Sequence, residues 1–191
     1  MRQPTKSSST AGTTELGPVV FEAAEIAAAV SRVAEEIRSD FRGERILMVG
    51  VLKGALLFLS DLMRELADHP LTIDFVVVSS YGSNAHGRNG VRLLKDLDQS
   101  PDVEHVLLVE DIVDEGFTLS YLLNNMRSRK AASVRSCALI DKPFRRAVDV
   151  KADYVGLHAA SDDFLVGYGL DFQERFRNLP HIRQLQSRVP T

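Results

Sequence analysis

Short apolar runs alternate along this sequence with segments whose apolar residues recur at helical spacing. The predicted strands are residues 45–49, 71–79, 103–109, 134–140 and 154–159. The predicted helices are residues 21–39, 54–66 and 118–129. Strands separated by helices predict an α/β fold with a mainly parallel central sheet flanked by helices. In such folds ligands bind beyond the carboxyl ends of the strands, so functional residues are expected there.

Length and composition indicate one folded domain. The chain has 191 residues, of which 45% are apolar and 26% charged, enough for one hydrophobic core. Residues 1–16 are rich in Ser and Thr and are expected to form a flexible N-terminal tail, followed by a single domain over residues 17–191. The sequence contains neither the roughly 20 apolar residues that a membrane span needs nor a signal peptide. We therefore expect a cytoplasmic protein with no membrane partner.

Charge and cysteine content narrow the possible functions further. The formal net charge of -3 and the lack of a basic stripe argue against a nucleic-acid partner, which leaves a nucleic-acid-binding module as a weak alternative. The single cysteine, Cys137, excludes an intrachain disulfide. Because it lies in an apolar run, it is expected to be a buried core thiol.

The most informative segment runs from Glu110 to Thr118, where an apolar run meets several carboxylates, a glycine and a threonine. The start of a helix presents unpaired N–H groups that hold phosphate, and Gly116 lets the backbone approach it closely. Carboxylates such as Glu110 and Asp111 suit a ribose diol or hydrated magnesium, and Asp114 is placed to act as a general base. The alternative is that Asp114 caps the helix and the acidic pair is a solvated strand end.

This loop resembles the phosphoribosyl-pyrophosphate motif of type I phosphoribosyltransferases. Its start, Val109-Glu110-Asp111-Ile112, resembles the hypoxanthine-guanine phosphoribosyltransferase family in particular. The resemblance implies a purine salvage enzyme that uses Mg²⁺ and transfers 5-phosphoribosyl from phosphoribosyl pyrophosphate to hypoxanthine or guanine. The products would be IMP or GMP and pyrophosphate. It also implies a small hood formed by the terminal segments, and a homodimer or homotetramer.

Other motifs extend the resemblance in chain order. Leu52-Lys53-Gly54 resembles the family's pyrophosphate-binding loop, and Ser80-Tyr81 begins a segment similar to its flexible loop, which closes over the site. Lys142 follows a strand and matches the lysine that contacts the purine 6-oxo group. By composition, residues 81–90 are expected to form a mobile loop. Judged from spacing alone, the two lysines are ordinary surface residues, and a plain surface loop is the alternative for residues 84–90.

The segment 164–177 completes the resemblance. Phe164 matches the residue that stacks on the purine, although a core aromatic is the plain reading, and Leu165 would offer backbone groups to the purine edge. Asp171 matches the carboxylate on the magnesium side. Arg177 matches the arginine that contacts pyrophosphate, a role that suits the guanidinium fork.

The resemblance therefore assigns roles residue by residue. The implied catalytic residues are Asp114, Lys142 and Arg177. The implied purine-binding residues are Lys142, Phe164, Leu165 and Asp171. The implied metal ligands are Glu110, Asp111 and Asp171. The implied donor-binding residues are Leu52, Lys53, Gly54, Ser80, Tyr81, Glu110, Asp111, Asp114, Glu115, Gly116, Phe117 and Thr118.

Glu115 departs from the family pattern, which has Thr or Ser at this position. A carboxylate beside a phosphate is repelled, so we expect Glu115 to point outward and to weaken donor binding while its backbone N–H still serves the phosphate. Two alternatives stay open: a non-catalytic sensor of phosphoribosyl pyrophosphate or nucleotide on the same fold, and a xanthine-preferring enzyme.

Overall fold

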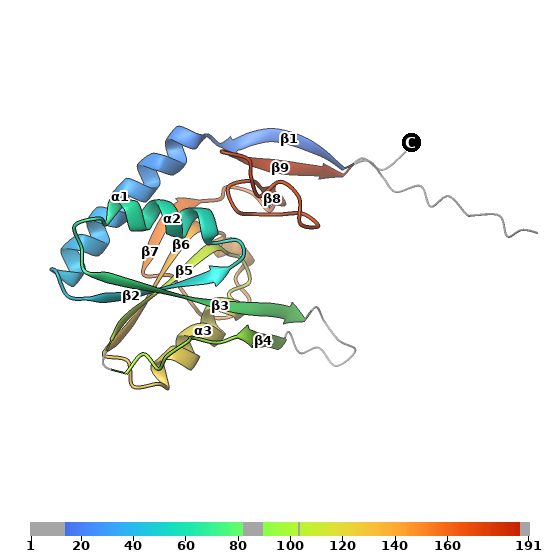
Figure 1. Cartoon of the computed structure of the whole chain (residues 1–191). Coiled ribbons are helices and arrows are strands. Elements are labelled where there is room, and N and C mark those ends of the chain that lie inside the picture. Colours follow the sequence, from blue (N-terminus) through green and yellow to red (C-terminus); the bar gives the residue numbers. More distant parts are fainter. Residues whose placement is uncertain (1–13, 82–89, 103, 188–191) are drawn as a thin grey trace, which may run out of the picture.

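A central sheet organises the chain, for which a computed structural model describes residues 14–81, 90–102 and 104–187 (Figure 1). Its strand order is β4-β3-β2-β5-β6-β7, and every neighbouring pair is parallel except β3 and β4. The bounds are β2 (Ile46–Leu52), β3 (Leu71–Tyr81), β4 (Gly90–Lys95), β5 (His105–Val113), β6 (Ser133–Asp141) and β7 (Tyr154–His158). The predicted α/β fold with a mainly parallel sheet is confirmed.

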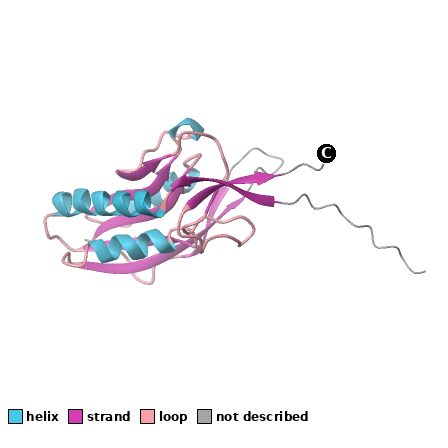
Figure 2. Cartoon of the chain, turned by 90° about the horizontal axis from the view of Figure 1, so that it is seen from above, coloured by secondary structure: helices cyan, strands magenta, loops and turns pink. Residues whose placement is uncertain are grey.

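Three α-helices cover the two faces of the sheet within the described residues: α1 (Ala23–Phe41), α2 (Leu56–Glu65) and α3 (Phe117–Arg127). Figure 1 shows α1 and α2 on one face and α3 on the other, and Figure 2 shows α1 and α2 side by side. Helix α1 begins with a capping box between Glu22 and Glu25 and ends at Arg42 in the left-handed conformation.

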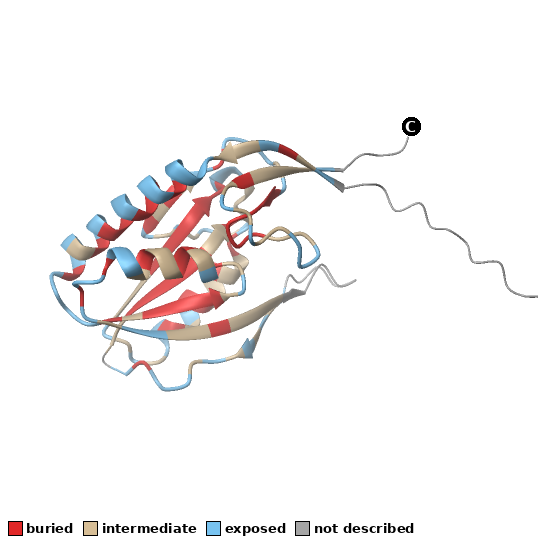
Figure 3. Cartoon of the chain, turned by 45° about the horizontal axis from the view of Figure 1, so that its top comes forward, coloured by how far each residue is buried: buried red, intermediate tan, exposed pale blue. Residues whose placement is uncertain are grey.

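Two apolar clusters fill the space between the sheet and its helices. Along β5 the buried side chains alternate, so Leu107 and Val109 pack toward α1 and α2 while Val106 and Leu108 pack toward α3. Strand β5 is therefore buried on both faces, as the red strands of Figure 3 show. Cys137 is buried as expected, and burial raises the pKa of its thiol.

The segments near the two ends of the described chain form a hood above the main sheet (Figure 1). It is a second antiparallel sheet of order β1-β9-β8, comprising β1 (Thr14–Phe21), β8 (Leu165–Val166) and β9 (Ile182–Ser187). The expected tail at residues 1–16 is too long, because Thr14 to Leu16 pair with β9; residues 1–13 lie outside the described residues.

Other element boundaries differ from the predicted ones because strands stay paired beyond the end of their apolar residues. Strand β5 continues to Val113, since Glu110 and Ile112 still pair with β6. The acidic pair therefore belongs to the strand, where the sequence predicted a loop. Of the predicted loop at residues 81–90, Tyr81 and Gly90 end and begin strands, and the rest lies outside the described residues. None of the helices in the described ranges is long and apolar enough to cross a bilayer.

The strand order places the ligand site. Strand β2 has β3 on one side and β5 on the other, so the direction of winding reverses there. In open parallel sheets the loops that leave such neighbouring strands separate at their carboxyl ends and leave a crevice between them. The loops after Leu52 and Val113 therefore flank the expected binding site.

Candidate active site

A cavity of about 570 Å³ lies at this switch point. Three segments supply most of its predicted site residues: the loop after β2, the end of β5 with the start of α3, and the hood. The predicted residues that line it are Leu52, Lys53, Gly54, Glu110, Asp111, Asp114, Glu115, Gly116, Phe117, Thr118, Asp171 and Arg177. Residues from distant parts of the sequence thus share one surface.

Gly54 lies where three of these segments meet. A Cβ added there would fall 1.6 Å from Oδ2 of Asp111, so the Asp111 carboxylate occupies the space of a side chain. On the hood side, a Cβ at Gly169 would fall 2.0 Å from the Gly54 carbonyl oxygen, and Gly169 has a φ of +98°. Only glycine can both come this close to the neighbouring backbone and adopt this positive φ.

The two acidic residues of β5 are enclosed rather than solvated. Glu110 is only 4% exposed, and its Oε1 has no hydrogen-bond partner among the described residues. Burial, reinforced by the charge of Asp111, raises the pKa of Glu110 to about 8. Burial also raises the pKa of Asp111 to about 6. The reading of this pair as a solvated strand end is wrong for Glu110.

The start of α3 faces the cavity without a side-chain cap. Gly116 is the N-cap residue at a φ of 90°, and no side-chain cap bonds the free N–H groups of the first turn within the described residues. The alternative role of Asp114 as a helix cap is therefore excluded. A Cβ at Gly116 would lie 2.6 Å from Val150 Cγ1, so packing also requires glycine here. The first turn of α3 remains available for an anion.

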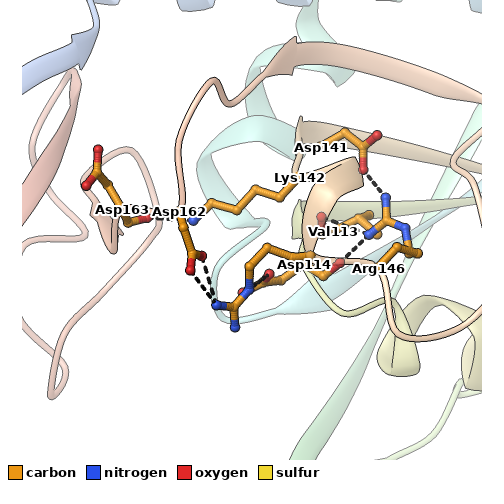
Figure 4. A network of polar contacts seen from close by, with 8 residues as sticks. Val113, Asp114, Asp141, Lys142, Arg146, Asp162 and Asp163 are labelled. Carbon is orange, nitrogen blue, oxygen red and sulfur yellow. Dashed lines mark hydrogen bonds and ion pairs between the residues drawn. The ribbon is translucent and has the colours of Figure 1, made fainter.

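Asp114 instead forms an ion pair. Nε of Arg145 donates to its Oδ1 at 2.8 Å, and Nη1 of Arg145 contacts both oxygens of Asp162 (Figure 4). Arg146 donates to the backbone carbonyl oxygens of Val113 and Asp114 and pairs with Asp141. Glu115 is exposed, and its carbonyl oxygen accepts a hydrogen bond from Ala147.

A chain of ion pairs joins the β2 loop to the hood. Lys53 Nζ lies 2.8 Å from Glu174 Oε2, and Arg177 Nη2 lies 3.3 Å from Glu174 Oε1 and 2.8 Å from Asp171 Oδ1. Asp171 Oδ2 also accepts the backbone N–H of Glu174 at 2.8 Å. The two cations expected to meet pyrophosphate are therefore both paired with Glu174.

Of the four residues predicted to bind the purine, Asp171 lines the cavity, whereas Lys142, Phe164 and Leu165 are not in its lining. Lys142 is only 4% exposed and Nζ donates to the carbonyl oxygen of Asp163 at 2.5 Å, so the plain reading as a surface lysine is wrong. Phe164 is 54% exposed and meets Phe172 edge to face, so it is not a core aromatic. Leu165 is buried, and its backbone pairs with Gln184 in the hood.

The contacts predicted for Ser80 and Tyr81 at the start of the flexible loop fall outside the described residues. Ser80 and Tyr81 form the last part of β3, and their side chains lie outside the described residues.

Comparison with known proteins identifies the family. The profile of the phosphoribosyl transferase domain matches residues 20–173. The hypoxanthine-guanine phosphoribosyltransferase of Bacillus subtilis is 43% identical over 92% of this chain and 96% of that protein. The corresponding Mycobacterium tuberculosis enzyme is 44% identical over 92% and 89%. A crystal structure of hypoxanthine phosphoribosyltransferase from Staphylococcus aureus superposes with a TM-score of 0.84 at 38% identity, over 90% of this chain and 92% of that one.

The chain belongs to the hypoxanthine-guanine phosphoribosyltransferase family. The family and the transferase class predicted from the sequence are thereby confirmed. The hood brings Asp171 and Arg177 to the cavity, whose lining includes both residues.

Three polar residues of this site carry no assignment from the sequence: Arg145, Arg146 and Glu174. From the sequence alone, each of these residues is an ordinary charged surface residue. Their partners lie far along the chain, as in the contacts of Arg145 with Asp114 and Asp162. The only sequence signal was the position of the two arginines shortly after Lys142.

The carboxylates of Glu110 and Asp111 are of the chemical type that binds a hard cation such as Mg²⁺. In the described part of the chain, no group of three or more His, Cys, Asp or Glu side chains forms a preformed metal cage. Mg²⁺, however, is usually bound through one or two carboxylates together with substrate phosphates and water. The unpartnered Oε1 of Glu110 and the cavity-lining carboxylate of Asp111 fit that mode.

The raised pKa of Glu110 predicts a pH-dependent stability. The folded chain keeps this proton up to about pH 8, whereas the unfolded chain releases it near the ordinary 4.5. Because the folded state binds more protons in this range, the free energy of unfolding should fall as pH rises, with a contribution from Glu110 of ~1.4 kcal/mol per pH unit at most. Urea denaturation in EDTA from pH 5 to 8 should show this slope, and Glu110→Gln should reduce it. The exposed Glu65→Gln variant is the matched control, and an unchanged slope in Glu110→Gln would contradict the assignment.

The contact between Gly169 and Gly54 predicts an unequal cost of two alanine substitutions. Gly43 and Gly169 both have positive φ, but a Cβ at Gly43 would meet nothing within 4 Å. Gly43→Ala should therefore cost only the backbone strain of ~1 kcal/mol. Gly169→Ala should cost clearly more, because the hood must move away from Gly54. Equal losses of unfolding free energy in urea would show that the close approach imposes no constraint.

Proposed function

We propose that this chain is a purine salvage enzyme that transfers 5-phosphoribosyl from phosphoribosyl pyrophosphate to hypoxanthine or guanine. Family membership supports this proposal together with one observation above all. The half-exposed carboxylate of Asp114 lines the same cavity as the uncapped start of α3 and as Arg177. A general base, an anion site and a guanidinium for the leaving group are thus available on one surface.

The anion-binding groups of the cavity bind the donor, phosphoribosyl pyrophosphate. The first turn of α3, with the hydroxyl of Thr118, binds the 5-phosphate. Pyrophosphate takes the side chains of Lys53 and Arg177, and it replaces Glu174 as their partner. Glu110, Asp111 and Asp171 would hold Mg²⁺ together with the donor's oxygens, and the ion would offset the charge of the leaving pyrophosphate.

The acceptor end uses residues of β6 and the hood. Lys142 donates to the 6-oxo group, Phe164 stacks on the ring, and the Leu165 backbone contacts the purine edge. Purine N9 then bonds to the anomeric carbon while the bond from this carbon to pyrophosphate breaks, with the electron pair leaving on pyrophosphate. Asp114 accepts the N7 proton in the same step. Ser80 and Tyr81 belong to the loop expected to close over the donor and exclude water.

Two further proposals concern the cellular location and the oligomeric state of the enzyme. A cytoplasmic location and a homodimer or homotetramer fit the family, and both remain predictions. Sedimentation at micromolar concentration measures the assembly directly.

The base preference and the role of Asp114 are tested in one assay. Purified enzyme with phosphoribosyl pyrophosphate and Mg²⁺ should release pyrophosphate with hypoxanthine or guanine, and faster than with xanthine. Asp114→Asn should reduce turnover by about 10²–10⁴, the usual contribution of a general base. Asp98→Asn, an exposed carboxylate outside the cavity, should leave turnover unchanged.

Other outcomes of this assay point elsewhere. Release only with xanthine supports the xanthine-preferring alternative. No release with any base, combined with measurable nucleotide binding, supports the sensor. Unchanged turnover in Asp114→Asn removes this residue from the mechanism.

Glu115 predicts a weakened donor affinity. It is exposed at the edge of the cavity, next to the proposed phosphate site. A repulsion of ~1 kcal/mol, as between solvated charges about 4 Å apart, corresponds to a roughly fivefold effect. Glu115→Thr should therefore lower the donor KM a few fold, and Glu115→Gln, which removes only the charge, should give most of that gain. A higher KM in Glu115→Thr would contradict the repulsion.

A further inference from the structure

Arg145 connects two parts of the site that the proposed mechanism uses separately. It ends the short helix η1 (Pro143–Arg145), and its backbone N–H donates to the carbonyl oxygen of Lys142 at 3.0 Å. Its Nε lies 2.8 Å from Oδ1 of Asp114, and its Nη1 lies 2.8 and 3.0 Å from the two oxygens of Asp162. One guanidinium therefore holds two carboxylates from different loops (Figure 4).

This arrangement contributes little to stability. The side chains of Arg145, Asp114 and Asp162 are 36%, 43% and 63% exposed, and exposed ion pairs typically contribute only ~0.2–1 kcal/mol. Its effect is instead to fix the relative orientation of Arg145 and Asp114. The guanidinium is planar and rigid, so anchoring its Nη1 on Asp162 restricts the direction from which Nε meets Asp114.

The neighbouring Arg146 has a different task. Its side chain is 13% exposed, and it donates to the carbonyl oxygens of Val113 and Asp114. Arg146 thus fixes the backbone of the loop, while Arg145 contacts the carboxylate of Asp114. Within the described residues Arg145 engages only Oδ1, so Oδ2 is free to accept a proton.

The second carboxylate links the base to the purine side. Asp162 lies shortly before Phe164, and the intervening Asp163 accepts the hydrogen bond of Lys142 at 2.5 Å. Lys142 and Arg145, one turn apart, therefore both hold residues 162–163. The positions of Asp114, Lys142 and Phe164 are coupled through these two contacts.

We propose that Arg145 is a positioning residue of the transfer reaction, which holds Asp114 through Oδ1 so that Oδ2 faces the purine N7 proton, and which takes its own alignment from Asp162. The inference rests on the proposed function, because it requires Asp114 to be the base. Arg145 acts through Asp114 and needs no contact with the substrate.

The test is the single-turnover rate of pyrophosphate release with hypoxanthine, measured together with the donor KM. Arg145→Gln should lower the rate about 10–100-fold, as expected when a catalytic group loses its alignment. The donor KM and the melting temperature should stay close to wild type. Arg145→Lys, which keeps the charge but loses the fork, should recover part of the rate.

Two further variants test the chain of contacts. Asp162→Asn should give a smaller loss, and adding it to Arg145→Gln should cause no further loss, because both substitutions break one linkage. Arg129→Gln removes another partly buried arginine, paired with Asp96 away from the cavity, and should leave the rate unchanged.

Each other outcome is decisive. An active wild type with an unimpaired Arg145→Gln overturns this inference alone. A proportional change of rate, donor KM and melting temperature in Arg145→Gln shows a merely structural role and also overturns it. An inactive wild type overturns the proposed function, and the inference fails with it.

Discussion

The site depends on the absence of a side chain at Gly54. The Asp111 carboxylate fills the space of a Cβ at this position, and Gly169 of the hood touches its carbonyl oxygen from the other side. Strand β5, the β2 loop and the hood can come this close only because glycine presents bare backbone at both positions. Removing either glycine would separate the acidic strand end from the loops expected to hold the substrate.

The parallel sheet supplies the rest of the site by placing loops from distant segments together. Because β3 and β5 lie on opposite sides of β2, the loops that leave β2 and β5 diverge and leave a cavity at the carboxyl ends. The strand burial that makes this sheet stable also encloses Glu110 and raises its pKa. The same packing therefore accounts both for the fold and for a carboxyl group that is protonated at neutral pH without a cation.

Local patterns predicted five of the six strands of the main sheet and its three helices, but not the edge strand β4. They also singled out the acidic segment 110–118, whereas the other cavity-lining motifs were implied by the family resemblance. Apolar runs and helical spacing depend on neighbouring residues, which one sequence displays. The hood strands were not located, because β1 and β9 are mixed in polarity and stabilised by pairing with each other. The end of β5 was misplaced for a similar reason, since Glu110 stays in the strand through its pairing with β6. Arg145 could not be assigned at all, because its function depends on two carboxylates brought near it only by folding.

The pairing of β1 with β9 also bears on how the site assembles. These strands join positions as distant as Leu16 and Leu185, so their contact closes a loop of nearly the whole described chain. Such closure carries a large entropic cost and is slow compared with the formation of local structure. The main sheet can bring Gly54 and Asp111 together by itself, but Asp171 and Arg177 belong to the segment that joins β8 to β9. In the proposed function the donor contacts Arg177, so donor binding reports on the most non-local strand pairing among the described residues. A ligand that holds Arg177 in place then also stabilises the pairing of β1 with β9.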